Sequence, residues 1–193
     1  MRVFLTYPYL PGEGGMETVI RKVLDNVPNN VELIFFLPGG VEKKEWLNGM
    51  KNKNVKFIFH NKKKYVDIFL DTYKTIKELN PNIVITMNNL QIIPLLLVRK
   101  KIKNMKVVSW NHFSLKYTKL NFLLKYCDSF LAISSGIKNE LINLGINSQN
   151  IHLIFNPVDK TDLIIPCSTD VMKLIYVGRV QYKKQTNTRK KKK

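Results

Sequence analysis

Short apolar, β-branched runs alternate regularly along this chain with segments whose apolar residues recur at helical spacing. Strands and helices in that order are typical of a parallel sheet whose crossover connections are helices. The apolar runs predict strands at 2–6, 31–37, 55–59, 83–86, 106–110, 129–133 and 151–155. The helical patterns predict helices at 16–27, 41–47, 65–79, 89–101 and 134–144. We therefore expect an α/β fold, a Rossmann-like parallel sheet with helices on both faces.

The end of the chain predicts a second, incomplete domain. Residues 172–177 form a new apolar run like the opening strand of another α/β domain, whereas residues 185–193 contain no apolar side chain and cannot bury a face. We expect a Rossmann-like domain at 1–158, a linker at 159–170, the first strand of a truncated second domain at 171–182, and a basic disordered tail at 183–193. Our hypothesis for this ending is a truncation, or a frameshift in an A-rich tract of the gene.

The chain is strongly basic, with a formal net charge of +18. Seven of its positive charges fall in residues 183–193, and many of the others are lysines beside asparagines. Three interpretations fit: a solvated surface that reflects an AT-rich coding sequence, a face for anionic lipid, or a nucleic-acid site. Because no basic motif is interleaved with aromatic residues, we rank the last one lowest and expect no nucleic-acid partner.

Cysteine spacing and hydropathy bear on three further properties of the chain: metal binding, membrane spans and cellular location. Cys127 and Cys167 lack metal-type spacing, so we expect free thiols and no metal site. No apolar run reaches the roughly 18 to 20 residues that span a membrane. Since the N-terminus opens with a strand and not with a secretion signal, we expect a cytoplasmic location, with peripheral contact to the inner face of the plasma membrane.

A glycine-rich loop lies between the first strand and the first helix. It contains Gly12, Gly14 and Gly15, followed by Glu17. Glycines let backbone amides approach a ligand closely, and a helix N-terminus favours anions. The spacing does not match the dinucleotide fingerprint, and a flexible turn that needs positive φ explains it equally well.

A second candidate segment, 109–114, follows the fifth strand. His112 lies just past the strand end, where parallel sheets place reactive groups, and an imidazole can hydrogen-bond a sugar hydroxyl. Trp110 or Phe113 can stack on a sugar face. A structural histidine that binds a loop carbonyl is an equally good explanation.

Two weaker segments follow. Ser134 begins a predicted helix and suits an N-cap, since the pattern of a nucleophile elbow is not met. Arg179 and Lys184 follow the apolar run at 172–177, and two cations there could hold a diphosphate. They could equally be part of the basic tail.

Together and in this order, these segments resemble the retaining glycosyltransferases of family four, which have the GT-B architecture. Within that family the similarity is greatest to the subgroup that adds galactose to lipopolysaccharide through a 1,6 linkage. The resemblance covers about residues 1–182. Its motifs are GGMETVI at 14–20, SWNHFSL at 109–115, LAISSGIK at 131–138, FNPV at 155–158 and YVGR at 176–179.

The resemblance implies two facing Rossmann-like domains, with the acceptor on the first and the nucleotide sugar on the second. It implies that Gly14 and Gly15 lie against the donor diphosphate, and that His112 is catalytic and contacts the transferred sugar or the acceptor. It implies further substrate or donor-phosphate contacts. These are Glu17, Trp110, Ser134, Asn156, Arg179 and Lys184. No metal and no cofactor is implied beyond a donor substrate such as UDP-galactose.

The sequence departs from the family at Lys183, where the family usually has Glu. From the resemblance we also expect the rest of the donor-binding domain to be missing. We expect the full-length protein to transfer a hexose, with galactose favoured, to a lipopolysaccharide or capsule acceptor, and the 193-residue chain alone to be inactive. The expected partners are the nucleotide-sugar donor, a lipid-linked glycan acceptor and an anionic inner-membrane surface. The alternative is a non-catalytic Rossmann-type binding subunit that works with a partner chain.

Overall fold

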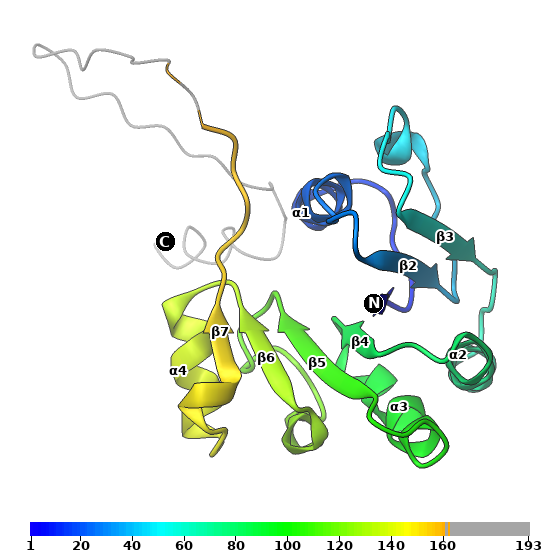
Figure 1. Ribbon diagram of the computed structural model, residues 1–193. Coiled ribbons are helices and arrows are strands. Elements are labelled where there is room, and N and C mark those ends of the chain that lie inside the picture. The colour runs from blue at the N-terminus through cyan, green and yellow to red at the C-terminus, as the bar shows by residue number, and fades with distance from the viewer. Residues whose placement is uncertain (161, 163–193) are drawn as a thin grey trace, which may run out of the picture. The chain divides into compact units, whose positions relative to one another are not determined.

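The computed structural model describes residues 1–160 and 162, and residues 1–158 form one compact unit (Figure 1). The strands are β1 (Arg2–Thr6), β2 (Glu32–Leu37), β3 (Val55–Phe59), β4 (Ile83–Thr86), β5 (Lys106–Asn111), β6 (Ser129–Ala132) and β7 (Ile151–Leu153). The α-helices are α1 (Gly15–Asp25), α2 (Tyr65–Leu79), α3 (Ile92–Arg99) and α4 (Ser135–Asn143). Short 3-10 turns are η1 (Glu45–Leu47), η2 (Asn89–Gln91), η3 (Asn121–Tyr126) and η4 (Ser148–Asn150).

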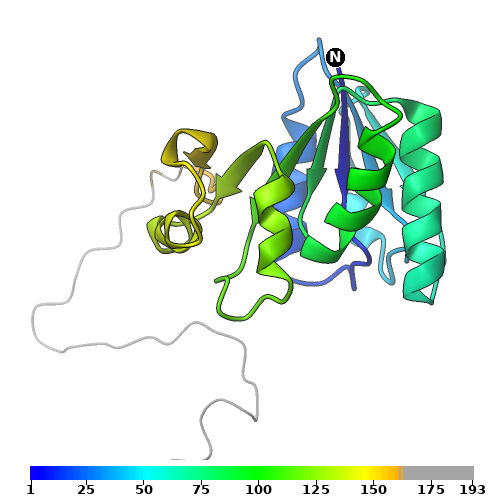
Figure 2. The same cartoon turned by 90° about the horizontal axis from the view of Figure 1, so that it is seen from below.

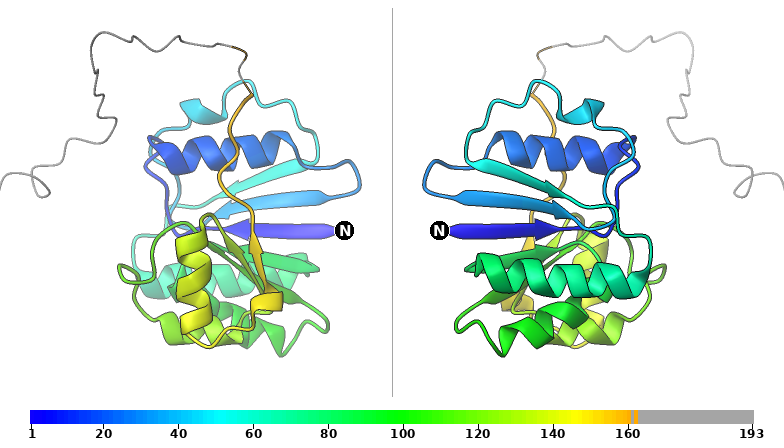
Figure 3. Two further views of the ribbon diagram at one scale, coloured as in Figure 1. Left: turned by 90° about the vertical axis from the view of Figure 1, so that its left-hand side faces the viewer. Right: turned by 90° about the vertical axis from the view of Figure 1, so that its right-hand side faces the viewer.

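Within the described residues, seven strands form a single parallel sheet in the order β3-β2-β1-β4-β5-β6-β7. The chain builds outwards from β1 in one direction through β2 and β3, and then returns to add β4 on the other side of β1. Since every ladder is parallel, all carboxyl ends meet at one edge, and in Figure 3 the arrowheads of β1 and β2 point to it. The Rossmann-like α/β fold expected from the sequence is confirmed.

Helices cover both faces of the sheet, as expected. In Figure 1, α1 lies on one side of the strands and α2, α3 and α4 lie on the other, and in Figure 2 α2 and α3 lie in front of the strands. Successive side chains of β1 point to opposite faces of the sheet, which produces two hydrophobic cores. Leu5 packs in one cluster with Ile20 of α1, and Phe4 packs in the other with Ile76 of α2. A third cluster joins α4 and η3 to β6.

Three predicted elements differ from the structure. The helix expected at 41–47 is only the turn η1, and the helix expected at 89–101 is divided into η2 and α3. The strand expected at 151–155 ends at Leu153, because Phe155 has a left-handed backbone (φ 49°) that a strand cannot contain. Apart from residues 159, 160 and 162, the predicted linker, the predicted second-domain strand and the predicted basic tail lie outside the described residues.

The loop between β1 and α1 is held closely against its neighbours. The buried Glu17 accepts a hydrogen bond at Oε1 from the Gly12 amide (3.0 Å), and Lys43 N donates to Pro11 O (3.1 Å). Gly12 has a φ of 89°, and a Cβ at this position would lie 2.1 Å from the Lys43 carbonyl oxygen. By contrast, a Cβ on Gly15 would have no heavy atom within 4 Å. The two glycines are therefore needed for different reasons.

We expect Gly12→Ala to lower the free energy of unfolding by about 2 to 3 kcal/mol, because it combines a steric clash with an unfavourable φ. The matched control Gly15→Ala adds a methyl group in open space in the first helical turn. It should leave stability unchanged or raise it by about 0.5 kcal/mol. Urea denaturation of both variants measures the difference, and equal stabilities would contradict this account of the loop.

Candidate functional site

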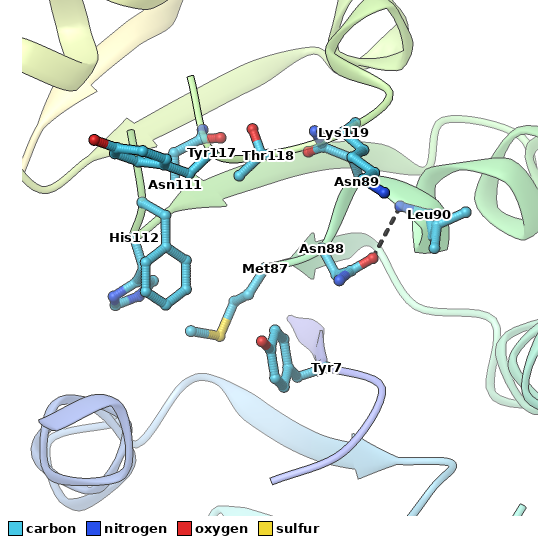
Figure 4. Close-up of a pocket in the computed structure, with 11 residues that line it drawn as sticks. Tyr7, Met87, Asn88, Asn89, Leu90, Asn111, His112, Tyr117, Thr118 and Lys119 are labelled. Carbon is cyan, nitrogen blue, oxygen red and sulfur yellow. Dashed lines mark hydrogen bonds between the residues drawn. The ribbon is translucent and has the colours of Figure 1, made fainter. Parts of the chain in front are cut away.

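A polar pocket opens at the carboxyl edge of the sheet, where the strand order reverses between β1 and β4 (Figure 4). Its volume is about 230 Å³. Parallel α/β sheets bind their ligands at this position, because the crossovers leave the two central strands in opposite directions. The lining residues follow β1 and β4, end β5, or belong to the loop after β5. They are Tyr7, Met87, Asn88, Asn89, Leu90, Asn111, His112, Phe113, Tyr117, Thr118 and Lys119.

His112 is the titratable imidazole of this pocket. Its ring centroid lies 4.6 Å from that of Trp110, which belongs to the core cluster beneath α1. Among the described residues, His112 Nε2 and Trp110 Nε1 are buried and have no hydrogen-bond partner. Burial lowers the pKa of His112 to about 4, so its imidazole is neutral at physiological pH. A buried group without a partner carries a desolvation cost, which a ligand that completes the hydrogen bond would remove.

The first turn of α1 lies at the same edge as His112 and on the same face of the sheet. Gly14 is its N-cap with φ 142°, and no side chain caps the helix. The first-turn amides of a helix have no intrahelical partner and attract anions. Because Trp110 packs in the cluster that α1 covers and His112 contacts Trp110, the imidazole and the glycine loop share one rim, as the sequence interpretation requires.

Tyr7 and Glu17 connect the loop to the pocket. Burial, and secondly the negative charge of Glu17, raise the pKa of the Tyr7 phenol. Glu17 is 4% exposed and binds the Gly12 amide, so the structure gives it a role in holding the loop. In Figure 4, Tyr7 and Met87 lie on the wall opposite the loop of Tyr117 and Thr118.

Asparagines after β4 fix the shape of the pocket. Asn88 accepts a hydrogen bond from Leu90 N (2.9 Å), the dashed line in Figure 4. Asn89 Nδ2 donates to Lys119 O (2.9 Å) and to Asn121 Oδ1 (3.0 Å), which fastens the loop after β5. Sequence reasoning missed Tyr7 and these asparagines. Their position directly after β1 and β4 was the available signal, because those strand ends meet at the ligand-binding edge.

The remaining candidate residues lie elsewhere. Ser134 Oγ accepts a hydrogen bond from Ile137 N (3.2 Å), which confirms the capping role that the sequence favours for it. Trp110 is only 3% exposed, so its ring cannot stack on a sugar in this structure, and that expectation is corrected in favour of Phe113, which is 53% exposed. Asn156 is exposed beyond β7 and does not line the pocket. Arg179 and Lys184 lie outside the described residues.

Within residues 1–160 and 162, no group of three His, Cys, Asp or Glu side chains is arranged to hold a metal ion. Over the same residues, no helix has the length and apolar character that a membrane span needs.

Comparisons with known proteins agree with this geometry. Residues 13–162 match the profile of glycosyltransferase family 4. The lipopolysaccharide 1,6-galactosyltransferases of Escherichia coli K12 and Salmonella typhimurium LT2 are each 34% identical to this chain, over 96% of it and 54% of their own length. The chain therefore spans about half the length of these curated relatives.

Solved glycosyltransferase structures have a similar fold over most of this chain. A lipopolysaccharide outer core galactosyltransferase in its apo form superposes with a TM-score of 0.69 at 31% identity, over 88% of this chain and 50% of that one. Anabaena HepE in complex with UDP and glucose superposes with a TM-score of 0.57 at 14% identity, over 82% of this chain and 45% of that one. At that identity the second similarity concerns the fold alone.

The lowered pKa of His112 makes stability depend on pH. The folded protein protonates this imidazole only near pH 4, whereas the unfolded chain does so near pH 6.5, so the unfolded state binds more protons between these values. Stability should therefore fall by about 3 kcal/mol as the pH drops through this window. Urea denaturation across the pH range should show a flatter curve for His112→Gln than for the control His152→Gln, an exposed histidine of β7. Parallel curves would contradict the assignment.

Proposed function

The chain belongs to glycosyltransferase family 4, and from this premise we propose that it is the acceptor-side half of a hexosyltransferase. The donor is a nucleotide sugar, with UDP-galactose favoured, and the acceptor is a lipid-linked lipopolysaccharide or capsule glycan. The chain spans 54% of its 34% identical relatives, which are named as lipopolysaccharide 1,6-galactosyltransferases. The alternative, a non-catalytic binding subunit, is not favoured, because those relatives are named as transferases.

The observation that carries the proposal is the polar pocket at the carboxyl edge of the sheet, whose lining residue His112 has a buried Nε2 without a partner among the described residues. In a glycosyl transfer, an acceptor hydroxyl oxygen forms a bond to the anomeric carbon of the donor, and the nucleoside diphosphate leaves. Each sugar offers several hydroxyls that can donate and accept hydrogen bonds. His112 Nε2 supplies the partner for one of them, and Asn88, Asn89 and Asn111 supply the polar wall around it.

The low pKa of His112 defines its role in this proposal. A general base works best when its pKa lies near the operating pH, and a value of about 4 is too low for that task. A neutral imidazole instead holds a hydroxyl at a fixed position, and a hydrogen bond in a site of low dielectric constant is stronger than one in water. We therefore assign His112 to orienting a hydroxyl of the transferred sugar or the acceptor, in direct contact with substrate.

The start of α1 is assigned to the donor diphosphate. The amides after Gly14 face the edge at which the pocket opens, and no side chain caps this helix end. In this proposal Arg179 and Lys184 supply the matching cations, which stabilise the charge on the departing diphosphate. We also propose a cytoplasmic protein that acts at the membrane surface, where a lipid-linked acceptor would be found.

The test is a chimera that joins residues 1–158 to the part of the Escherichia coli relative that follows the region matched to them, so that the relative supplies everything after residue 158. It should transfer galactose from UDP-galactose to a lipopolysaccharide acceptor, whereas the 193-residue chain alone should show no turnover. In the chimera, His112→Phe removes one hydrogen bond to substrate and should lower kcat/KM by about 100-fold. Radiolabel transfer from UDP-galactose measures both.

The matched control is His152→Gln, because this histidine is exposed on β7, away from the pocket, and should retain full activity. Turnover by the unfused chain would contradict the assignment of half a site to it. Equal loss in both histidine variants would place the sugar elsewhere.

A further inference from the structure

Two exposed aromatic rings border the polar pocket, both from the loop after β5. Phe113 is 53% exposed, and Tyr117 is 87% exposed although it lines the pocket. The phenol hydroxyl of Tyr117 has no hydrogen-bond partner among the described residues. In Figure 4 this ring lies on the wall opposite Tyr7 and Met87. A large ring that stays in water at the edge of a polar cavity offers an apolar face that a ligand can cover.

The loop that carries Tyr117 is fixed to helix α4. Both carboxylate oxygens of Glu140 accept hydrogen bonds from the loop, one from Ser114 Oγ (2.8 Å) and one from Leu115 N (2.6 Å). The Asn121 side chain binds the same turn through Leu115 O (2.7 Å), and Tyr117 N donates to Ser114 O (3.0 Å). Hydrogen bonds to a charged group are stronger than those between neutral groups. The loop therefore presents the ring at a fixed place before a ligand binds, which lowers the entropic cost of binding.

The same pocket offers hydrogen-bonding groups at fixed positions. Asn88 accepts a hydrogen bond at Oδ1 from Leu90 N (2.9 Å), and within the described residues its Nδ2 has no partner. His112 Nε2 is buried and also lacks a partner among the described residues. A pyranose carries hydroxyls around its edge and C–H bonds on its faces. An aromatic face beside oriented polar groups matches both parts of such a ring.

A neighbouring hollow has the opposite character. An apolar groove of about 510 Å³ lies on the face of the sheet covered by α2 and α3, and Leu90 lines both cavities. The groove is lined mainly by aliphatic and aromatic side chains such as Phe69 and Ile93, which offer no partner for a hydroxyl. A sugar therefore suits the polar pocket, whose volume of about 230 Å³ can hold a single ring.

We propose that Tyr117 is the stacking platform for the acceptor sugar and determines which acceptors this protein binds. One face of the pyranose covers the phenol ring, while hydroxyls at its edge bind Asn88 Nδ2 and His112 Nε2. Stacking needs a face of C–H bonds, so the platform selects sugars whose hydroxyls around that face are equatorial. The inference rests on the proposed function for the identity of the ligand as an acceptor glycan. Binding of that glycan requires no donor.

The test is an NMR titration of the 193-residue chain with a delipidated lipopolysaccharide core oligosaccharide that lacks the transferred galactose. Tyr117→Ala should weaken binding about tenfold, because it removes an aromatic contact with the sugar. Tyr117→Phe keeps the ring and should bind within about twofold of the unaltered chain. The oligosaccharide has no lipid, so a loss of binding reports contact with the glycan itself.

Phe122→Ala is the matched control. Phe122 is 62% exposed on η3, in the same connection between β5 and β6, and it does not line the pocket. This variant removes an exposed ring of the same kind and should bind the oligosaccharide as the unaltered chain does. Both aromatic positions are exposed, and circular dichroism checks that each variant is folded.

The contact at the edge of the sugar has its own pair of variants. Asn88→Ser keeps a side-chain oxygen that can accept from Leu90 N but removes the amide donor, so it should weaken binding about fivefold to tenfold. Asn147→Ser is its control. Asn147 accepts a hydrogen bond from Gln149 N (2.9 Å) in the same way at the start of η4, outside the pocket, and its variant should bind normally.

In the chimera, Tyr117→Ala should raise the acceptor KM about tenfold and leave kcat and the KM of UDP-galactose within about twofold. The reason is that a stacked acceptor makes the same contact in the ground state and in the transition state. A variant that raised the KM of UDP-galactose instead would place the ring against the nucleotide sugar and overturn the proposal.

Equal binding by Tyr117→Ala and by the unaltered chain would also overturn it, as would an unaltered chain that binds no oligosaccharide. An inactive chimera would contradict the proposed function alone, provided that the 193-residue chain binds the oligosaccharide and loses it with Tyr117→Ala. An active chimera that is indifferent to Tyr117→Ala would leave the proposed function intact and remove the stacking platform.

Discussion

Parallel pairing of β1 with β4 determines where every other feature of the site lies. This ladder places Thr6 opposite Thr86, so the chain leaves both strands at the same edge while the crossovers depart towards opposite faces. Neither connection fills the space between these two strand ends, so a pocket remains there. Residues separated by about a hundred positions, such as Tyr7 and His112, line one pocket for this reason alone.

The two cavities at this edge differ in the chemistry of their walls. Amides and a neutral imidazole line the first, and aliphatic and aromatic side chains line the second, with Leu90 between them. The structure keeps this division sharp through local hydrogen bonds. Asn89 fastens the loop after β5, and Glu17 fastens the glycine loop, so both polar walls are fixed before any ligand arrives.

Periodicity in the sequence was sufficient to predict the sheet, its direction and the helices on both faces, because buried parallel strands and amphipathic helices leave unmistakable patterns. It was insufficient for the loop after β5, where η3 begins at a left-handed Leu120 and follows contacts made by Asn89, which is distant in sequence. In the candidate site, the strand direction was sufficient to predict that Gly14 and His112 lie at the same edge of the sheet. The burial of Trp110 depended on packing beneath α1, which no local pattern reports.

The pocket is lined by an uncharged imidazole and by asparagines, and this composition has a further consequence. Hydrogen bonds between neutral groups are hardly screened by dissolved ions, whereas attraction between exposed charges decays over a Debye length of about 8 Å at physiological ionic strength. Under the proposed function, binding of a sugar hydroxyl in this pocket would therefore change little with salt concentration.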